Sequence, residues 1–238
     1  MEKVVCALWR HGGEDIAAFN ARLLAELPGA LEEAGASTIR INLRDDAVAP
    51  AMGLIQRWQA PQQDAIVQFW LPSANALFRG PADAAIARHC NRFAAWLVTE
   101  STVIANLAHP PSTGQRTWGW SQASFISFRR DIPREAALAY WLTHHTRVAI
   151  DTQSNFEYVQ NLIVRPLTDD APAYDAFVEE CFPEAAMTEP TAFFDAVGDT
   201  ARFDANLAAM MESCAAFIDF ARIDILPTSQ FSFAGQAK

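Results

Sequence analysis

The chain has 238 residues, of which 51% are hydrophobic and 19% are charged, which suits one large domain or two of about 120 residues each. Its formal net charge of −10 disfavours nucleic-acid and anionic-membrane partners, because both require a basic surface. No apolar run approaches the ~18 residues of a membrane span, and the first residues resemble a strand rather than a leader, so we expect a cytoplasmic protein.

The first half of the sequence predicts the order β-α-β-β-α-β. A helix begins near Asp15 with an apolar stripe that runs to Leu27, Pro28 kinks or ends it, and Gly35 suits its C-terminal stop. Alternating β-branched and apolar residues indicate the strands. The expected strands are 3–10, 37–43, 64–71 and 102–107, and the second helix is expected over 81–98.

A segment rich in Pro, Ser, Thr and Gly then separates this half from the next. Residues 109–119 read HPPSTGQRTWG, the best linker in the chain. We therefore divide the chain into a degenerate module at 1–110, a linker at 111–120 and a second module at 121–238.

The second half repeats the same order of elements. The expected strands are 121–129, 156–164, 174–182 and 217–226, with a helix from Pro133 to about Ile150 and a second helix in two pieces around Gly198. Short matches recur in order, including Asp64-Ala65 with Asp175-Ala176, and Ala94–Leu97 with Ala215–Ile218. Together they indicate an internal repeat, the alternative being coincidence between two ordinary α+β segments.

This duplication predicts an α+β fold in which two ferredoxin-like βαββαβ modules are fused in one chain. One such module leaves the second face of its antiparallel sheet exposed, and an apolar face of that size must be covered. Two sheets packed face to face cover each other and can enclose a cavity, as in a dimeric α+β barrel. A monomer would then complete one barrel, with further oligomers still open.

The helix over 133–150 carries the most informative side chains. Leu138, Trp141, His145 and Val148 lie on one stripe, so His145 is expected on the inward, apolar face, while His144 groups with Tyr140. An imidazole with an ordinary pKa of about 6.5 suits proton transfer near neutral pH. Tyr158 and Gln160 share one face of the next strand and are placed to hydrogen-bond a carbonyl or hydroxyl group.

Residues 121–226 resemble the EthD family of the dimeric α+β barrel superfamily. The resemblance rests on Trp141-x-x-x-His145, on Tyr158-x-Gln160-Asn161, and on Tyr174-Asp175 with Phe182, whereas the first half lacks the Trp-x-x-x-His motif. It implies a barrel with a pocket near the helix histidine and a role in catabolism or biosynthesis of apolar and aromatic compounds. The end of the second half departs from the family pattern, with only Phe217 and Asp219 matching.

We therefore expect His145 as general acid/base, with Asp175 orienting it or stabilising an imidazolium, and Tyr140, Trp141, Tyr158 and Gln160 as substrate-binding residues. Enolisation, dehydration, decarboxylation or isomerisation of an apolar or aromatic carbonyl compound would suit such a site. The alternatives are a non-catalytic protein that binds a hydrophobic small molecule and a barrel without a ligand. Asp175 is repeated by Asp64 in the half without the histidine, which favours a structural role for it.

No cofactor or metal is expected from the sequence. The four cysteines form no CxxC pair, which predicts reduced, buried thiols rather than a zinc or redox site. The sequence lacks GxGxxG, P-loop, GxSxG and HExxH motifs. His145 is conceivable as a haem ligand, but no second feature supports a haem site.

Overall fold

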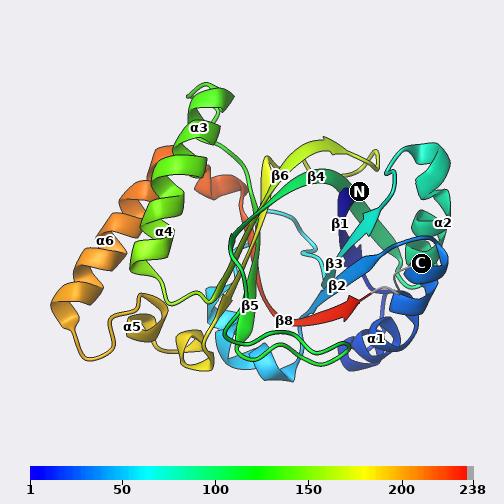
Figure 1. Cartoon of the computed structure of the whole chain (residues 1–238), viewed down its shortest axis with the longest axis horizontal. Coiled ribbons are helices and arrows are strands. Elements are labelled where there is room, and N and C mark those ends of the chain that lie inside the picture. Colours follow the sequence, from blue (N-terminus) through cyan, green and yellow to red (C-terminus); the bar gives the residue numbers. More distant parts are fainter. Residues whose placement is uncertain (235–238) are drawn as a thin grey trace.

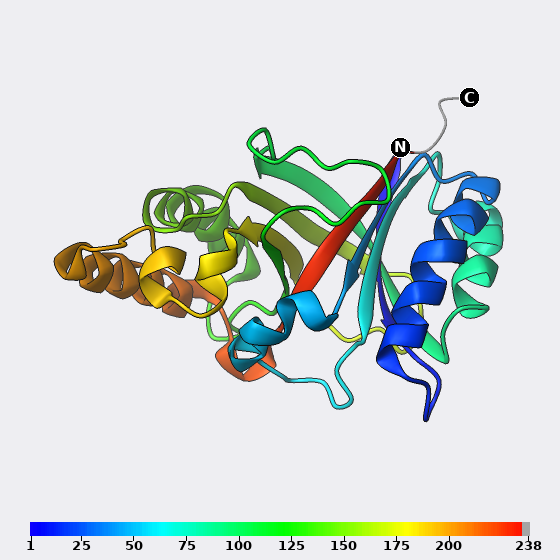
Figure 2. The same cartoon turned by 90° about the horizontal axis from the view of Figure 1, so that it is seen from below.

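The computed structural model describes residues 1–234 and shows a mixed α+β fold built on a β-barrel. Eight strands close into this barrel in the order β1-β3-β2-β8-β5-β7-β6-β4, and every neighbouring pair is antiparallel. Helices α1 and α2 cover one side, and α3 to α6 cover the opposite side (Figures 1 and 2). The molecule is thus a barrel between two helical layers.

The two halves of the chain follow the same sequence of elements. The first half contains β1 (Glu2–Trp9), α1 (Ile16–Glu33), β2 (Thr38–Leu43), β3 (Ala65–Leu71), α2 (Ala76–Ala87) and β4 (Arg92–Ile104). The second contains β5 (Trp120–Ile126), α3 (Arg134–Tyr140), α4 (Thr146–Thr152), β6 (Glu157–Pro166), β7 (Ala176–Phe182), α5 (Pro190–Phe193), α6 (Thr200–Phe217) and β8 (Asp224–Ala234). A π-helical turn, Trp141–His145, joins α3 to α4, and short 3₁₀ helices occupy Asp46–Leu54, Glu184–Met187 and Phe220–Arg222.

The barrel closes through two equivalent seams. Within each half the strand order is the same, β4-β1-β3-β2 in the first and β8-β5-β7-β6 in the second. Pairing of β2 with β8 and of β4 with β6 joins the halves edge to edge. The expected pair of sheets packed face to face is therefore one continuous sheet, and this closure satisfies the edge strands that a separate sheet would leave unpaired.

Three predicted elements were placed wrongly. The segment 81–98 is not one helix, because α2 ends at Ala87 and β4 begins at Arg92, and the strand expected at 102–107 is only the end of β4, which stops at Ile104. Phe93 and Leu97 still pack against the helical side from β4, so a strand period extended the apparent helical stripe. The last strand begins at Asp224 rather than 217, since α6 continues through Phe217.

Two smaller expectations also need correction. Helix α1 passes through Pro28 and ends at Glu33, because Leu23, Leu27 and Leu31 form one fully buried stripe whose packing outweighs the local cost of the proline. The match of Ala94–Leu97 with Ala215–Ile218 compares a strand with a helix end, so it is no part of the repeat.

The barrel interior combines an aromatic part with a polar network. Trp9, Trp96, Phe125 and Phe177 belong to a buried cluster inside the barrel. The polar part centres on Glu179, which is fully buried and lies 2.8 Å from the Arg40 guanidinium. Further partners of Glu179 are Asn42, Gln68, Ser121 and Gln230.

The backbone conformation directly before β5 requires a glycine at position 119. Its φ is +81°, and an added Cβ would lie 2.1 Å from the Phe182 carbonyl oxygen. Gly13 has a similar φ of +80° but open space around it. We expect Gly119→Ala to lower the free energy of unfolding by more than ~2 kcal/mol and Gly13→Ala by only about 1 kcal/mol, measured by urea unfolding. Equal losses in the two variants would contradict the steric argument.

Candidate functional site

A partly enclosed cavity lies outside the barrel, between the second half's strands and the helices that cover them. Its volume is about 200 Å³. Strands β5, β6 and β7 form its floor, and the π-helical turn and α6 form its walls. The lining is mainly apolar and includes Ile126, Trp141, Val178, Met210, Cys214, Phe217 and Ile223, with polar groups from Gln122, Ser124, His145, Tyr158 and Glu180.

The π-helical turn determines which side chains face this cavity. Ala137, Trp141, His145 and Ala149 are buried, so the buried line advances by four residues instead of alternating between three and four. The Thr146 hydroxyl donates to the Trp141 carbonyl oxygen at 2.8 Å, which satisfies an acceptor inside the widened turn. Such insertions occur often at functional sites. The turn therefore brings Trp141 and His145 together on the cavity side, whereas Leu138 and Val148, which were expected on the same stripe, are only half-buried.

His145 is held by a hydroxyl rather than by a carboxylate. Its Nδ1 lies 2.9 Å from Ser213 Oγ on α6, and its ring packs on Phe217 with 4.8 Å between centroids. Within residues 1–234 no hydrogen bond is made by its Nε2. Burial, with a smaller effect of the nearby His144, lowers the pKa of His145 to about 4. The imidazole is thus neutral at pH 7, and its pKa lies below the near-neutral value expected from sequence.

Glu180 is the site residue that sequence reasoning missed. It lies on β7, faces the cavity and accepts a hydrogen bond from Asn155 Nδ2 at 2.9 Å. Burial raises the pKa of Glu180 to about 7, and the Asn155 hydrogen bond only partly opposes this. The available signal was the pair Glu179-Glu180 within an otherwise apolar strand, where alternation sends one carboxyl into the barrel and the other into the cavity.

Tyr158 lines the cavity, and Gln160 supports it from behind. The Gln160 amide donates to the Tyr158 hydroxyl at 2.7 Å and to Thr146 Oγ1 at 2.9 Å. Burial raises the pKa of Tyr158, so its hydroxyl stays protonated and remains a hydrogen-bond donor. Of these two residues, the structure places Tyr158 at the cavity and Gln160 behind it, where it links the strand to Thr146 at the start of α4.

Asp175 lies away from His145, directly before β7. Its carboxylate accepts from the Phe128 backbone N–H at 2.8 Å and pairs with Arg130 and Arg134 at 3.1 and 3.3 Å. Asp64 does the same in the first half, where it accepts from the Arg10 backbone N–H at 3.0 Å. The repeat of Asp64 and Asp175 therefore reflects a shared strand connection, and Ser213 is the residue that orients His145.

Tyr140 does not line the cavity either. Its ring contacts His144 at 4.8 Å and Phe217 at 6.1 Å between centroids, so it supports the wall from the outer side. Met211 and Phe220 do line the cavity and are about half exposed, which places its entrance between α6 and the following 3₁₀ turn.

The size of the cavity limits what it can hold. An apolar cavity of ~150 Å³ accommodates benzene, so about 200 Å³ suits one aromatic ring with a small polar substituent. Sites for drug-sized ligands begin near ~300 Å³. The residues around His145 therefore do not fit a haem, which is larger still.

Comparison with known proteins identifies the fold. No protein-family model matches the chain, and no curated protein matches it. Among solved structures, an anthrone oxidase-like protein superposes with a TM-score of 0.58 at 9% identity, covering 99% of this chain and 94% of the other. A candidate monooxygenase from Lactobacillus acidophilus NCFM superposes with a TM-score of 0.51 at 9% identity, covering 100% and 97%. The chain has the fold of dimeric α+β barrel proteins.

Two features of residues 1–234 bear on partners. None of the helices there combines the length and apolar character needed to cross a membrane. The same residues contain no group of three or more His, Cys, Asp or Glu side chains arranged to hold a metal ion.

Proposed function

We propose that this protein is a cofactor-independent enzyme that performs acid/base chemistry on a small apolar or aromatic carbonyl compound. The observation that supports this most is the meeting of a neutral imidazole, a carboxyl group with a pKa raised to about 7 and a phenol in one mainly apolar cavity. Two titratable groups whose pKa values are pushed in opposite senses by one environment are typical of an acid/base pair. The proposal includes the EthD relationship and the two fused ferredoxin-like modules, divided at 111–120; residues 235–238 of the second module lie outside the described residues.

The proposed chemistry is a proton shift next to a carbonyl group. His145 Nε2 removes a proton from the carbon beside the carbonyl, and Glu180 or the Tyr158 hydroxyl donates a hydrogen bond to the oxygen where negative charge develops. For a ketone with a carbon–carbon double bond beyond the α-carbon, transfer of the Glu180 proton to that oxygen gives a neutral dienol. Return of the His145 proton to the far end of the dienol, with return of the dienol O–H proton to Glu180, gives the conjugated ketone and restores both side chains. The electron pair stays within the substrate, so no oxidant or reductant is consumed.

A binding role is the second candidate, and the low pKa of His145 supports it. An imidazole with a pKa of about 4 is a weak base, and a buried histidine bonded to Ser213 can serve packing alone. The protein would then hold an apolar ligand within a degradation pathway without converting it.

One set of variants separates the two roles. Single-ring ketones are screened for binding by calorimetry and for conversion by mass spectrometry, using wild type, His145→Ala and Ser124→Phe. Ser124 is buried in the cavity lining, so a phenyl ring there should block the ligand, whereas Ser101→Phe on the exposed end of β4 is the matched control.

If the protein is an enzyme, wild type should convert a bound ketone, and His145→Ala should lower turnover by at least ~100-fold. Of the variants, only Ser124→Phe should abolish binding. Retained binding without turnover in any form supports the binding role. Binding that survives Ser124→Phe would contradict the assignment of this cavity as the site.

A further inference from the structure

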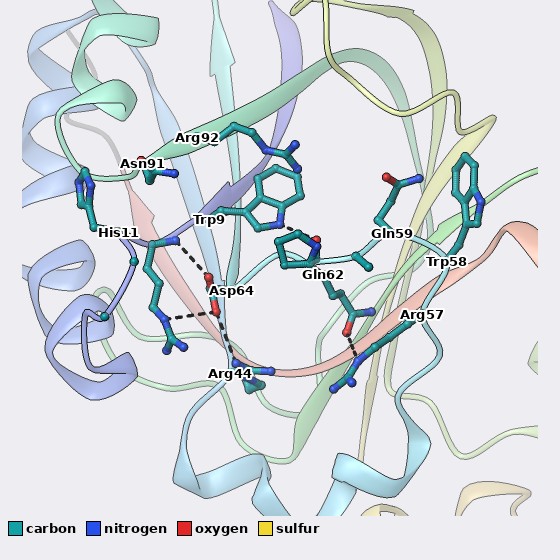
Figure 3. A pocket seen from close by; sticks show the side chains of 15 residues that line it. Trp9, His11, Arg44, Arg57, Trp58, Gln59, Gln62, Asp64, Asn91 and Arg92 are labelled. Carbon is teal, nitrogen blue, oxygen red and sulfur yellow. Dashed lines mark hydrogen bonds and ion pairs between the residues drawn. The ribbon is translucent and has the colours of Figure 1, made fainter.

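A second, larger pocket opens at one end of the barrel, in the first half of the chain. Its volume is about 760 Å³, and it is lined by the ends of β1 and β2, the starts of β3 and β4, and the loop 57–62 (Figure 3). Trp9 forms part of its floor and belongs to the aromatic cluster inside the barrel. The volume lies within the ~300–1,000 Å³ range of ligand sites.

The charge of this pocket is opposite to that of the chain. Four arginines line it, Arg10, Arg44, Arg57 and Arg92, with Asp64 as the one carboxylate of the lining. Asp170 reaches Arg92 from outside at 3.9 Å, and behind the loop the buried Asp224 is balanced by Arg222, which lies over the Trp58 ring. The local excess is therefore 5 − 3 = +2 with histidine neutral. The whole chain has 18 basic and 28 acidic residues. A concave cationic patch on an acidic protein focuses the field on anions.

Arg10 and Arg44 share one carboxylate, Asp64, which leaves much of their hydrogen-bonding capacity unused. Asp64 lies 3.8 Å from Arg10 Nε and 3.4 Å from Arg44 Nη2, and both arginine side chains are only about 30% exposed. The equivalent Asp175 in the second half holds its two arginines more closely, at 3.1 and 3.3 Å. Each guanidinium has five N–H donors, so most of those on Arg10 and Arg44 remain available for a second anion.

Arg57 and Arg92 are supported on the other side of the pocket. The Arg92 guanidinium stacks over the Trp9 ring at 3.8 Å, and Arg57 Nε donates to the Gln62 side chain at 3.3 Å (Figure 3). The loop that carries Arg57 is fixed by the buried Asp224, which accepts from the Trp58 backbone N–H at 3.1 Å. The four guanidinium groups are therefore presented by a framework with defined contacts.

We propose that this pocket binds a small organic dianion, such as a phosphate monoester or a dicarboxylate, and that it is a site separate from the helix-side cavity. Two negative charges match the local excess of +2. The planar guanidinium groups recognise phosphate and carboxylate oxygens in pairs, and Trp58 and Pro61 of the pocket lining supply apolar surface for the organic part. The proposal does not depend on the function assigned to His145.

The test is calorimetric titration at low salt with three single-ring probes, namely phenyl phosphate, phthalate and the neutral benzyl alcohol. Wild type should bind one or both dianions with 1:1 stoichiometry and not the alcohol. Tighter binding of phenyl phosphate would identify a phosphate ligand, and tighter binding of phthalate would identify a dicarboxylate. Absence of saturable binding of both dianions overturns the proposal.

Variants locate the site. Each charge-assisted contact corresponds to about tenfold in affinity, so Arg57→Gln with Arg92→Gln should weaken dianion binding by roughly 100-fold. The control Arg147→Gln removes an exposed arginine that pairs with Asp151 on α4, and it should leave affinity unchanged. Asp64→Asn frees Arg10 and Arg44 and should tighten binding severalfold. Equal affinity in the double variant and the control, or weaker binding in Asp64→Asn, would overturn the assignment.

Discussion

Replacing Arg40 by Met is expected to lower the free energy of unfolding by about 3–5 kcal/mol, because it leaves buried carboxylates without their cation. The Arg40 guanidinium lies 2.8 Å from Glu179 and 2.9 Å from Glu157 inside the barrel, and both carboxyl groups are almost completely shielded from water. The amides around Glu179 can hydrogen-bond it but cannot neutralise it. Urea unfolding at pH 7 measures the loss.

The pH dependence identifies the cause of that loss. Burial alone would raise the pKa of Glu179, but Arg40 and the surrounding amide donors outweigh it and hold the pKa at about 2. In wild type, Glu179 therefore contributes stability above its unfolded pKa, and this contribution is lost as pH falls toward 2. Without Arg40 the pKa of Glu179 should rise above the unfolded value, so the deficit of the variant should shrink in acid.

An exposed ion pair provides the control for Arg40. Arg147→Met removes the partner of Asp151 on α4 and should cost no more than about 0.5 kcal/mol. If Arg40→Met were as mild as this control, or if its deficit did not change with pH, the buried network would not be the ionic anchor of the barrel.

Much of the fold follows from periodicity, and the failures occur where period alone is ambiguous. The strands at 3–10, 37–43 and 64–71 were predicted because β-branched residues alternate there, and the structure has β1, β2 and β3 at these places. The region 81–98 was misread because both faces of β4 are apolar: Ala94 and Trp96 face the barrel interior, while Phe93 and Leu97 face the helices. A strand buried on both sides loses its alternation.

Barrel closure could not be derived from the same signals. The polar residues Arg40, Asn42 and Gln68 appear as ordinary alternation in an amphipathic strand, which predicts a solvent-facing side. In the structure they face a shared interior, where Glu157 and Glu179 from the other half of the chain pair with Arg40, and Asn42 and Gln68 donate hydrogen bonds to Glu179. The pairing of distant charges across two seams depends on three-dimensional closure and leaves no local trace in the sequence.

The roles expected for the site residues stay predictions, but the placement of several of their side chains follows from local geometry. Helical spacing brought Trp141 and His145 onto one face, and strand alternation placed Tyr158 toward them, since these are local geometric relations. Asp175 was paired with His145 on the analogy of other histidine–carboxylate pairs, but its partners are two arginines and a backbone N–H. The carboxyl group in the cavity comes from Glu180, whose register only the sheet fixes.

Glu180→Gln is expected to make the protein more stable at pH 8 and slower as a catalyst. The folded pKa of Glu180, about 7, lies above the ~4.3 of an unfolded glutamate. As pH rises between these values, ionisation stabilises the unfolded state alone, so wild type loses up to about 4 kcal/mol of unfolding free energy. This loss is nearly complete by pH 8. Glutamine has no such loss, and the variant should match wild type near pH 4 and exceed it at pH 8 in urea unfolding.

The stability of wild type alone does not isolate the effect of Glu180, because His145 changes the unfolding free energy in the opposite sense over the same pH range. Its pKa of about 4 lies below that of an unfolded histidine, so its contribution is present above about pH 6.5 and is lost as pH falls toward 4. The two slopes partly cancel in wild type. Glu212→Gln, at an exposed position on α6, is the control and should leave stability unchanged at both pH values.

Catalysis should respond in the opposite sense to stability. If Glu180 is the acid and His145 the base, turnover requires protonated Glu180 and neutral His145, so the rate should be highest between about pH 4 and 7. Glu180→Gln should lower turnover by roughly 10²–10⁴-fold and abolish the decline above pH 7. A carboxyl group that costs stability at neutral pH but can be removed without loss of rate would have no catalytic role. A gain in stability coupled to a loss of turnover is the result expected when burial of Glu180 is maintained for chemistry.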